Sequence, residues 1–204
     1  ILLILILNNP FETKEYFIKE PCSNKLSDKE YLLHMIPHHQ VAVDISYLLQ
    51  DKSKSPVMQE ILRKLIWTQR YEIKLMNEML TKLPHDMSND NIVMKRNYIV
   101  SKSDFMKPNK LGISDTYCDP HFFDPKAHME HMKHMKLDEN MYIKHMIPHH
   151  QVAVDMSKKL LKNTKNDFMI FLAYRIIRSQ QAEISLLNDL LNKENYFHTS
   201  ELLI

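Results

Sequence analysis

Apolar residues recur every three to four positions along four segments of the chain. This spacing predicts amphipathic helices, because at 3.6 residues per turn the positions i, i+3, i+4 and i+7 share one face. The segments group into two predicted helical hairpins, at residues 25–83 and 137–192. Residues 84–136 connect the hairpins, and residues 193–204 form a tail.

Capping residues mark where the predicted helices begin. Side-chain oxygens suited to N-capping stand at Ser27, Ser55, Asp138 and Asn166. Ser27 with Glu30 forms a capping box, and Pro56 follows Ser55 at the first helical position. The first helix of each hairpin is expected to run to about Gln50 or Leu161.

The two hairpins are copies of one unit. The segment HMIPHHQVAVD begins at His34 and again at His145, an offset of 111 residues (145 minus 34). The same offset continues without a gap into the second helix of each hairpin, so the repeat is the whole hairpin. Duplicated hairpins bury their apolar faces most simply as one four-helix bundle with pseudo-two-fold symmetry. The predicted fold is therefore all-α, with one domain at residues 25–192.

Composition narrows the class of protein further. A single glycine leaves little material for the tight turns of a β-sheet protein. A net charge of +2, from 27 basic and 25 acidic residues, provides no electrostatic basis for nucleic-acid binding. The two cysteines, Cys22 and Cys118, could form one disulfide in an oxidising compartment or remain free thiols.

The chain begins with the apolar run ILLILIL, within residues 1–24. Seven residues are too few to span a bilayer. We interpret the run as the remnant of a signal peptide or membrane anchor, the alternative being an apolar stretch that packs or frays. No A-x-A cleavage site follows, which favours an anchor. The expected location is therefore extracytoplasmic, as an exported or membrane-anchored protein.

Several histidines lie on the predicted buried face of the first helix. His34, Met35 and His38 fall on its apolar side, whereas His39 lies at the edge of that side. A buried imidazole without a partner costs roughly 1–3 kcal/mol, so such a set should be hydrogen-bonded internally or bound to metal. The repeat adds the equivalent residues of the second hairpin, His145, Met146, His149 and His150.

The second helix of each hairpin adds polar residues to this set. Gln69 is predicted to face inward and Glu72 to lie at the margin, and the repeat places Gln180 and Glu183 likewise. The amides are expected to orient imidazoles by hydrogen bonding rather than to bind metal. The carboxylates could be metal ligands or surface charges.

The connector contains the segment AHMEHMKHMK, in which histidine and methionine alternate with a period of three. The segment could be a solvated linker or a mobile arm that collects copper. Imidazole with thioether favours Cu(I), whereas imidazole with carboxylate also suits Zn(II), Cu(II) or iron. We therefore favour copper, with zinc or iron as alternatives. The candidate ligands of this segment are His128, Met129, His131, Met132, His134 and Met135.

The motifs resemble those of a bacterial family, the domain of unknown function 305. Its signature is similar to Met35–Ile45 and Met146–Met156, each followed by a helix with Q-x-x-E-I, at Gln69 and Gln180. The resemblance covers roughly residues 25–192. It implies a ferritin-like four-helix bundle, usually with an export signal, and in some members periplasmic copper binding. Two signature methionines are replaced, by Ile45 in the first copy and Leu187 in the second.

Three functions remain open at this point. The favoured hypothesis is copper sequestration through histidine and methionine, without turnover. A ferritin-like oxidoreductase is the enzymatic alternative, although neither hairpin has the Glu-x-x-His pair that di-iron bundles use. The third hypothesis is an interaction module whose buried histidines only specify packing.

Overall fold

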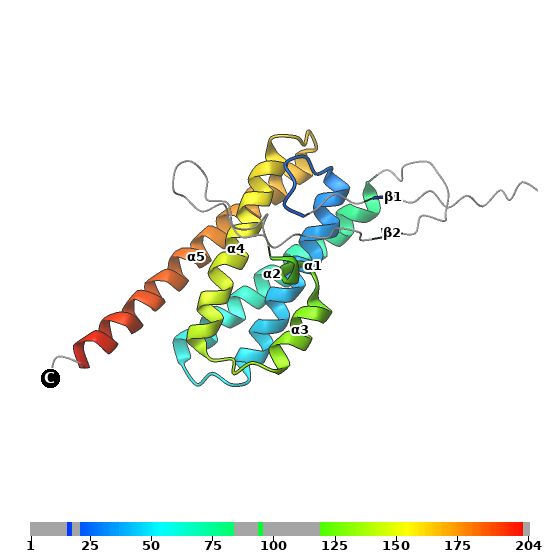
Figure 1. Ribbon diagram of the computed structural model, residues 1–204. Coiled ribbons are helices and arrows are strands. Elements are labelled where there is room, and N and C mark those ends of the chain that lie inside the picture. Colours follow the sequence, from blue (N-terminus) through cyan, green and yellow to red (C-terminus); the bar gives the residue numbers. More distant parts are fainter. Residues whose placement is uncertain (1–15, 18–20, 84–93, 96–118, 202–204) are drawn as a thin grey trace, which may run out of the picture.

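The computed structural model describes residues 16–17, 21–83, 94–95 and 119–201. Within these ranges the regular secondary structure is helical apart from two strands of two residues each, which pair in parallel with Tyr16 opposite Met94. The elements, shown in Figure 1, are β1 (Tyr16–Phe17), α1 (Asp28–Gln50), α2 (Pro56–Lys82), β2 (Met94–Lys95), η1 (Pro120–Phe123), α3 (Pro125–Lys133), α4 (Glu139–Leu161) and α5 (Asp167–Glu201).

The observed helix ends confirm the predicted caps. The side chains of Ser27, Ser55 and Asp138 each accept a hydrogen bond from the backbone N–H three residues later. Ser27 and Glu30 form the complete capping box. Asn166 accepts from the backbone N–H groups of the first turn of α5. These bonds satisfy donors that have no partner inside the helix.

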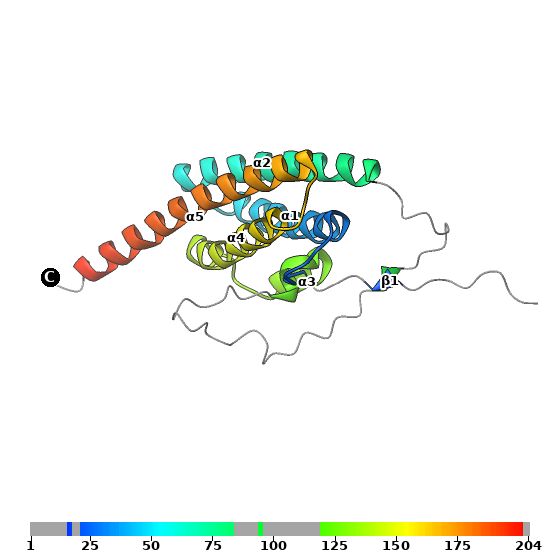
Figure 2. The same cartoon turned by 90° about the horizontal axis from the view of Figure 1, so that it is seen from above.

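The helices form two antiparallel hairpins, α1 with α2 and α4 with α5, which pack together as the predicted four-helix bundle (Figure 1). Seen from above, α2 and α5 form one layer, and α1 and α4 form the layer beneath it (Figure 2). On the other side of α1 lie η1 and α3. Helices α1 and α4 therefore run through the middle of the molecule, and α5 extends beyond the bundle at its C-terminal end.

Two reciprocal hydrogen bonds express the pseudo-two-fold symmetry. The hydroxyl of Tyr31 lies 2.7 Å from the Ser157 hydroxyl, and the hydroxyl of Tyr142 lies 2.7 Å from that of Ser46. Tyr142 and Ser157 are the repeat equivalents of Tyr31 and Ser46. All four side chains are buried. Each hairpin thus contributes a tyrosine to the serine of the other, and the duplication has produced one shared core.

The connector is more ordered than a linker or a mobile arm. Its described part forms η1 and α3, which begin behind the capping residues Asp119 and Asp124. Phe122, Phe123 and Met132 are buried in the bundle core. The expectation of a mobile arm is therefore wrong for residues 119–136, because these apolar side chains fix the segment against α1.

Several predictions concern residues outside the described ranges. These include the run ILLILIL, most of residues 84–118 and Cys118. Cys22 is disulfide-bonded, which agrees with one of the two states expected for it. Among the described helices, none is long and apolar enough to cross a membrane.

Candidate metal centre

A pair of stacked histidines lies between α1 and α4. The rings of His38 on α1 and His149 on α4 have centroids 3.7 Å apart and an interplanar angle of 29°. His149 is the repeat equivalent of His38, so the pseudo-two-fold axis passes between the two rings. Both side chains have no exposed surface. The sequence predicted this inward position, but only the packing of the hairpins brings the rings together.

Further histidines continue this pair toward α3. His145 lies one helical turn before His149, with ring centroids 6.0 Å apart. His128 of α3 comes within 4.9 Å of His145, measured between centroids. His128 is buried and His145 is partly buried. The His/Met segment of the connector therefore reaches the histidines of the repeat through His128.

Two phenylalanines of η1 cover the histidines. The ring of Phe122 packs edge-on against His145 and His149, at centroid distances of 5.3 and 4.8 Å. Phe123 contacts His34 and His38 at 6.1 and 5.2 Å. These contacts keep water from the imidazoles. Sequence reasoning missed both residues, although an adjacent pair of phenylalanines before a capped helix was a visible signal of a docked turn.

His39 is oriented by a buried carboxylate. Its Nε2 atom lies 3.0 Å from Oε2 of Glu72, and Nε2 of Gln180 lies 3.4 Å from the same ring nitrogen. His39 and Glu72 have no exposed surface. We expected His39 at the edge of the helix face and Glu72 at the margin of its helix. Both expectations are wrong, because α5 covers this side of the first hairpin.

Helix α5 provides the groups that hold Glu72. The Ser179 hydroxyl donates to Oε1 of Glu72 over 3.2 Å, and Nε of Arg175 lies 3.3 Å from the same oxygen. A buried carboxylate needs such partners because desolvation strongly penalises an isolated charge. Glu72 therefore links three elements, by joining His39 of α1 to side chains of α5.

The second hairpin repeats the pairing of histidine with glutamate. Nε2 of His150 lies 2.7 Å from Oε2 of Glu183, although the two groups are not aligned as a hydrogen bond. His150 is fully buried, whereas the Glu183 side chain is 17% exposed. The equivalence of His39–Glu72 and His150–Glu183 shows that the duplication preserved the pairing.

Many ring nitrogens of this cluster have no hydrogen-bond partner among the described residues. They include both nitrogens of His38, His149 and His128, and the Nδ1 atoms of His39 and His150. The side-chain amide of Gln69 also lacks a partner there, so its predicted role as an orienting group is not seen. Each such buried group costs on the order of 1–3 kcal/mol. These unpaired groups lower the stability of the fold, so packing alone does not explain why they are buried.

Burial keeps four imidazoles of this cluster neutral, those of His38, His149, His128 and His145. Desolvation and the neighbouring histidines hold the pKa values of His38 and His149 well below the usual range. Desolvation also lowers the pKa values of His128 and His145 to about 4. Neutral imidazole is the form whose lone pair binds metals. These four histidines therefore have their ligand atoms in the binding form at neutral pH.

The other predicted ligands differ in exposure. The methionines of the repeat, Met35 and Met146, are buried. In α3 and the turn that follows it, Met129 is partly buried and Met132 is buried, whereas His131, His134 and Met135 are exposed. The His/Met segment thus contributes some residues to the core and presents others to solvent.

The described residues contain no group of three or more His, Cys, Asp or Glu side chains arranged to hold one metal ion. The rings of His38 and His149 are stacked, so they face each other with their planes rather than with their ring nitrogens. The orphaned nitrogens nevertheless fit a soft ion, which binds two or three imidazole and thioether ligands. Binding at the stacked pair would require the rings to rotate.

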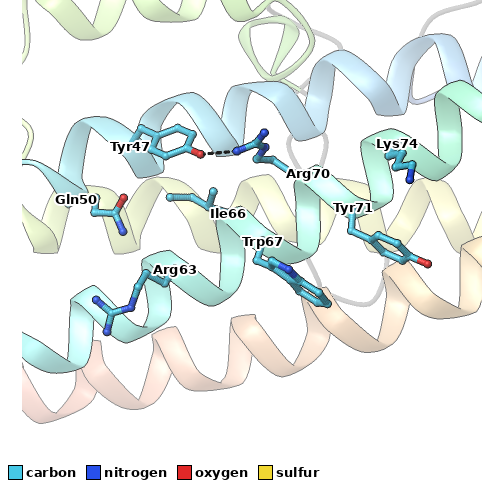
Figure 3. A pocket seen from close by; sticks show the side chains of 8 residues that line it. All are labelled: Tyr47, Gln50, Arg63, Ile66, Trp67, Arg70, Tyr71 and Lys74. Carbon is cyan, nitrogen blue, oxygen red and sulfur yellow. Dashed lines mark hydrogen bonds between the residues drawn. The ribbon is translucent and has the colours of Figure 1, made fainter.

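Several surface hollows lie away from the histidines. One hollow of about 540 Å³ is lined by aromatic and basic side chains of α1 and α2, among them Trp67, Tyr71 and Arg63 (Figure 3). The Trp67 and Tyr71 rings are stacked at a centroid distance of 6.0 Å, and Arg70 donates to the Tyr47 hydroxyl. The lining of this hollow contains no histidine or methionine, so it is separate from the candidate metal centre.

Solved structures share this fold. CopM in its Cu(II)-bound form is 25% identical in sequence, with a TM-score of 0.59 and coverage of 81% of this chain and 96% of CopM. A DUF305 protein of Streptomyces coelicolor is 21% identical, with a TM-score of 0.57 and coverage of 83% and 94%. A DUF305 fragment of Deinococcus radiodurans is 18% identical, with a TM-score of 0.56 and coverage of 81% and 95%.

Sequence comparison adds a viral relative and the family. An uncharacterised protein of Acanthamoeba polyphaga mimivirus is 42% identical over 57 residues, which are 28% of this chain. The match spans 38% of the length of that relative. The model of the family described as domain of unknown function (DUF305) matches residues 28–191, which include both hairpins and α3. This chain is therefore a member of the DUF305 family.

Proposed function

We propose that this protein binds and sequesters copper through the histidines and methionines of its bundle, without catalytic turnover. The observation that carries the proposal is the cluster of buried, neutral imidazoles around His38 and His149, whose nitrogens lack partners among the described residues. A bound ion would accept these lone pairs and offset the cost of burying them.

The pairing of His39 with Glu72 supports a metal-binding role. Ligating histidines typically donate their second ring N–H to a carboxylate, which fixes the tautomer and leaves the other nitrogen for the ion. His39 has this arrangement, with Nε2 against Glu72 and Nδ1 without a partner among the described residues. His150 lies equally close to Glu183, at 2.7 Å, but without the alignment of a hydrogen bond. His39 is therefore the candidate ligand whose ring is already oriented by a carboxylate, and His150 is its repeat equivalent.

The choice of copper rests on ligand chemistry and on a similar protein. Methionine lies beside histidine in both repeats, at Met35 and Met146, and thioether with imidazole selects Cu(I) over Zn(II). CopM, which has this fold, is known in a Cu(II)-bound form. The glutamates are held in separate His–Glu pairs, and this favours binding over a di-metal oxidoreductase.

The location follows as a second part of the proposal. Copper binding outside the cytoplasm agrees with the disulfide of Cys22, because disulfides persist in oxidising compartments. We propose an exported or membrane-anchored protein.

A competition titration tests the proposed function. Apo-protein is titrated with Cu(I) against a chromophoric chelator under reducing conditions, and sub-micromolar binding is expected. The paired substitutions H39A and H150A should weaken binding at least tenfold, whereas K64A, on the exposed side of α2, should leave it unchanged. Copper should also raise the melting temperature, because a ligand of the native state stabilises it. No binding tighter than micromolar would overturn the proposal.

A further inference from the structure

A series of histidines leads from exposed residues of η1 and α3 to the buried pair between α1 and α4. At the outer end the rings of His121 and His131 have centroids 6.0 Å apart, and both side chains are exposed. At the inner end His38 contacts His39 at 6.0 Å. Between these ends lie the contacts of 4.9, 6.0 and 3.7 Å that lead from His128 to His38.

One link of the series joins residues of the same helix. His128 and His131 are three positions apart on α3, and this spacing places side chains on the same side of a helix. His131 also contacts the ring of His121 in η1. The helix spacing therefore connects the surface pair to His128.

The spacing of the rings fits an ion that is shared by neighbouring imidazoles. Two imidazoles that bind one ion at about 2.1 Å from each nitrogen have ring centres no more than about 6.4 Å apart. Every measured contact in the series is within this limit, the longest being 6.0 Å. Cu(I) and Ag(I) accept two ligands, so an ion of this kind can be held by one pair at a time.

The outer pair has the features of a built site. Nδ1 of His121 lies 2.8 Å from Oδ1 of Asp119, and the same oxygen accepts the backbone N–H of His121. This carboxylate fixes the ring and leaves Nε2 for an ion. His131 approaches from α3, so η1 and α3 each contribute one imidazole.

We propose that His121 and His131 form a surface uptake site for a soft monovalent ion, Cu(I) or Ag(I), which passes from there into the bundle. The ion moves through His128 and His145 to the stacked pair His38–His149. Each step exchanges one neutral imidazole ligand for the next, so neither a proton nor an electron is transferred. Phe122 lies along the path at His145 and His149 and keeps water from it. The inference rests on the proposed copper binding and adds the route of entry.

The rate of loading tests this route. Apo-protein is mixed with the Cu(I) complex of a weak chromophoric chelator, and the loss of chelator absorbance is followed by stopped flow. The double substitution H121A and H131A should slow loading at least tenfold, while the affinity measured at equilibrium for the core changes less than twofold. H128A should slow loading with the outer pair intact. Circular dichroism checks that each variant keeps its helix content.

Lys126 provides the matched control. It is an exposed residue of α3, the same helix that contains His128 and His131, and it is not among the candidate ligands. K126A should load at the rate of the unsubstituted protein. Equal rates for the H121A and H131A double variant and the unsubstituted protein, or an equal slowing by K126A, would overturn the route. Failure of the unsubstituted protein to take up any Cu(I) at equilibrium would instead overturn the proposed function, and the route with it.

Discussion

His38 and His149 stack at a centroid distance of 3.7 Å across the pseudo-two-fold axis of the bundle. Their four ring nitrogens have no hydrogen-bond partner among the described residues. A bundle selected for stability alone would place apolar side chains here, because an unpaired buried polar group is destabilising. The stacked pair is therefore the feature that packing explains least.

Replacing the stacked pair by phenylalanine should stabilise the apo-protein. The double substitution H38F and H149F keeps two rings at the axis and removes four orphaned nitrogens. We expect the free energy of unfolding to rise by about 1–3 kcal/mol, measured by urea denaturation. The variant should also lose most of the copper-dependent rise in melting temperature. Y174F, at an exposed position of α5, is the control and should change neither quantity, whereas a destabilised double variant would contradict the interpretation.

Stability should fall as the pH is lowered below about 6.5, the usual pKa of histidine. The folded-state pKa values of His38, His149, His128 and His145 are lowered, so the unfolded chain binds more protons than the folded chain in this range. Their contribution is fully present above pH 6.5 and is lost progressively toward pH 4. Each pKa unit corresponds to about 1.4 kcal/mol per group.

Urea denaturation between pH 8 and pH 4 measures this dependence. The H38F and H149F variant separates the stacked pair from the carboxylates that titrate in the same range. Its loss of stability on acidification should be smaller than that of the unsubstituted protein. If the free energy of unfolding fell equally with pH in the two proteins, the stacked pair would not contribute to the pH dependence.

Substitutions of Glu72 and Glu183 should lower stability by different amounts but copper affinity by similar amounts. E72Q and E183Q each remove the carboxylate that faces a histidine, and we expect copper affinity to fall about 10- to 100-fold in either variant. E72Q should also lower the free energy of unfolding by about 3 kcal/mol, because Arg175 loses its buried partner. E183Q, at a partly exposed position, should cost less. E78Q on the exposed side of α2 is the control for both measurements.

The reciprocal tyrosine–serine bonds should both be stabilising. Y31F removes the partner of Ser157, and Y142F removes the tyrosine that faces Ser46, whose hydroxyl still donates to the Ala42 carbonyl, all four groups being buried. Each substitution should lower the free energy of unfolding by about 1–3 kcal/mol, with the smaller loss for Y142F. Y174F, at an exposed tyrosine of α5, should have little effect. A large effect of one substitution and none of the other would show that the hairpins pack asymmetrically.

The fold followed from the sequence because its signals are local. Periodicity identified the helices, side-chain oxygens such as those of Ser27 and Asp138 marked their starts, and the repeat gave the pairing of the hairpins. The same reasoning placed His38 and Gln69 in the interior, since each lies on the apolar side of its own helix. These features depend on the geometry of a single helix or on an exact internal match.

What the sequence could not determine depends on contacts between distant segments. The apolar pattern of a single helix placed His39 and Glu72 at the margin of its buried face. In the structure α5 buries both, because the pattern of one helix does not show which other helices cover it. The docking of Phe122 over His145 and His149 likewise depends on η1 meeting α4. The sequence by itself determined the helices, the duplication and the residue types of the site. The tertiary structure decided which imidazoles meet, because it sets the distances between side chains far apart in the chain.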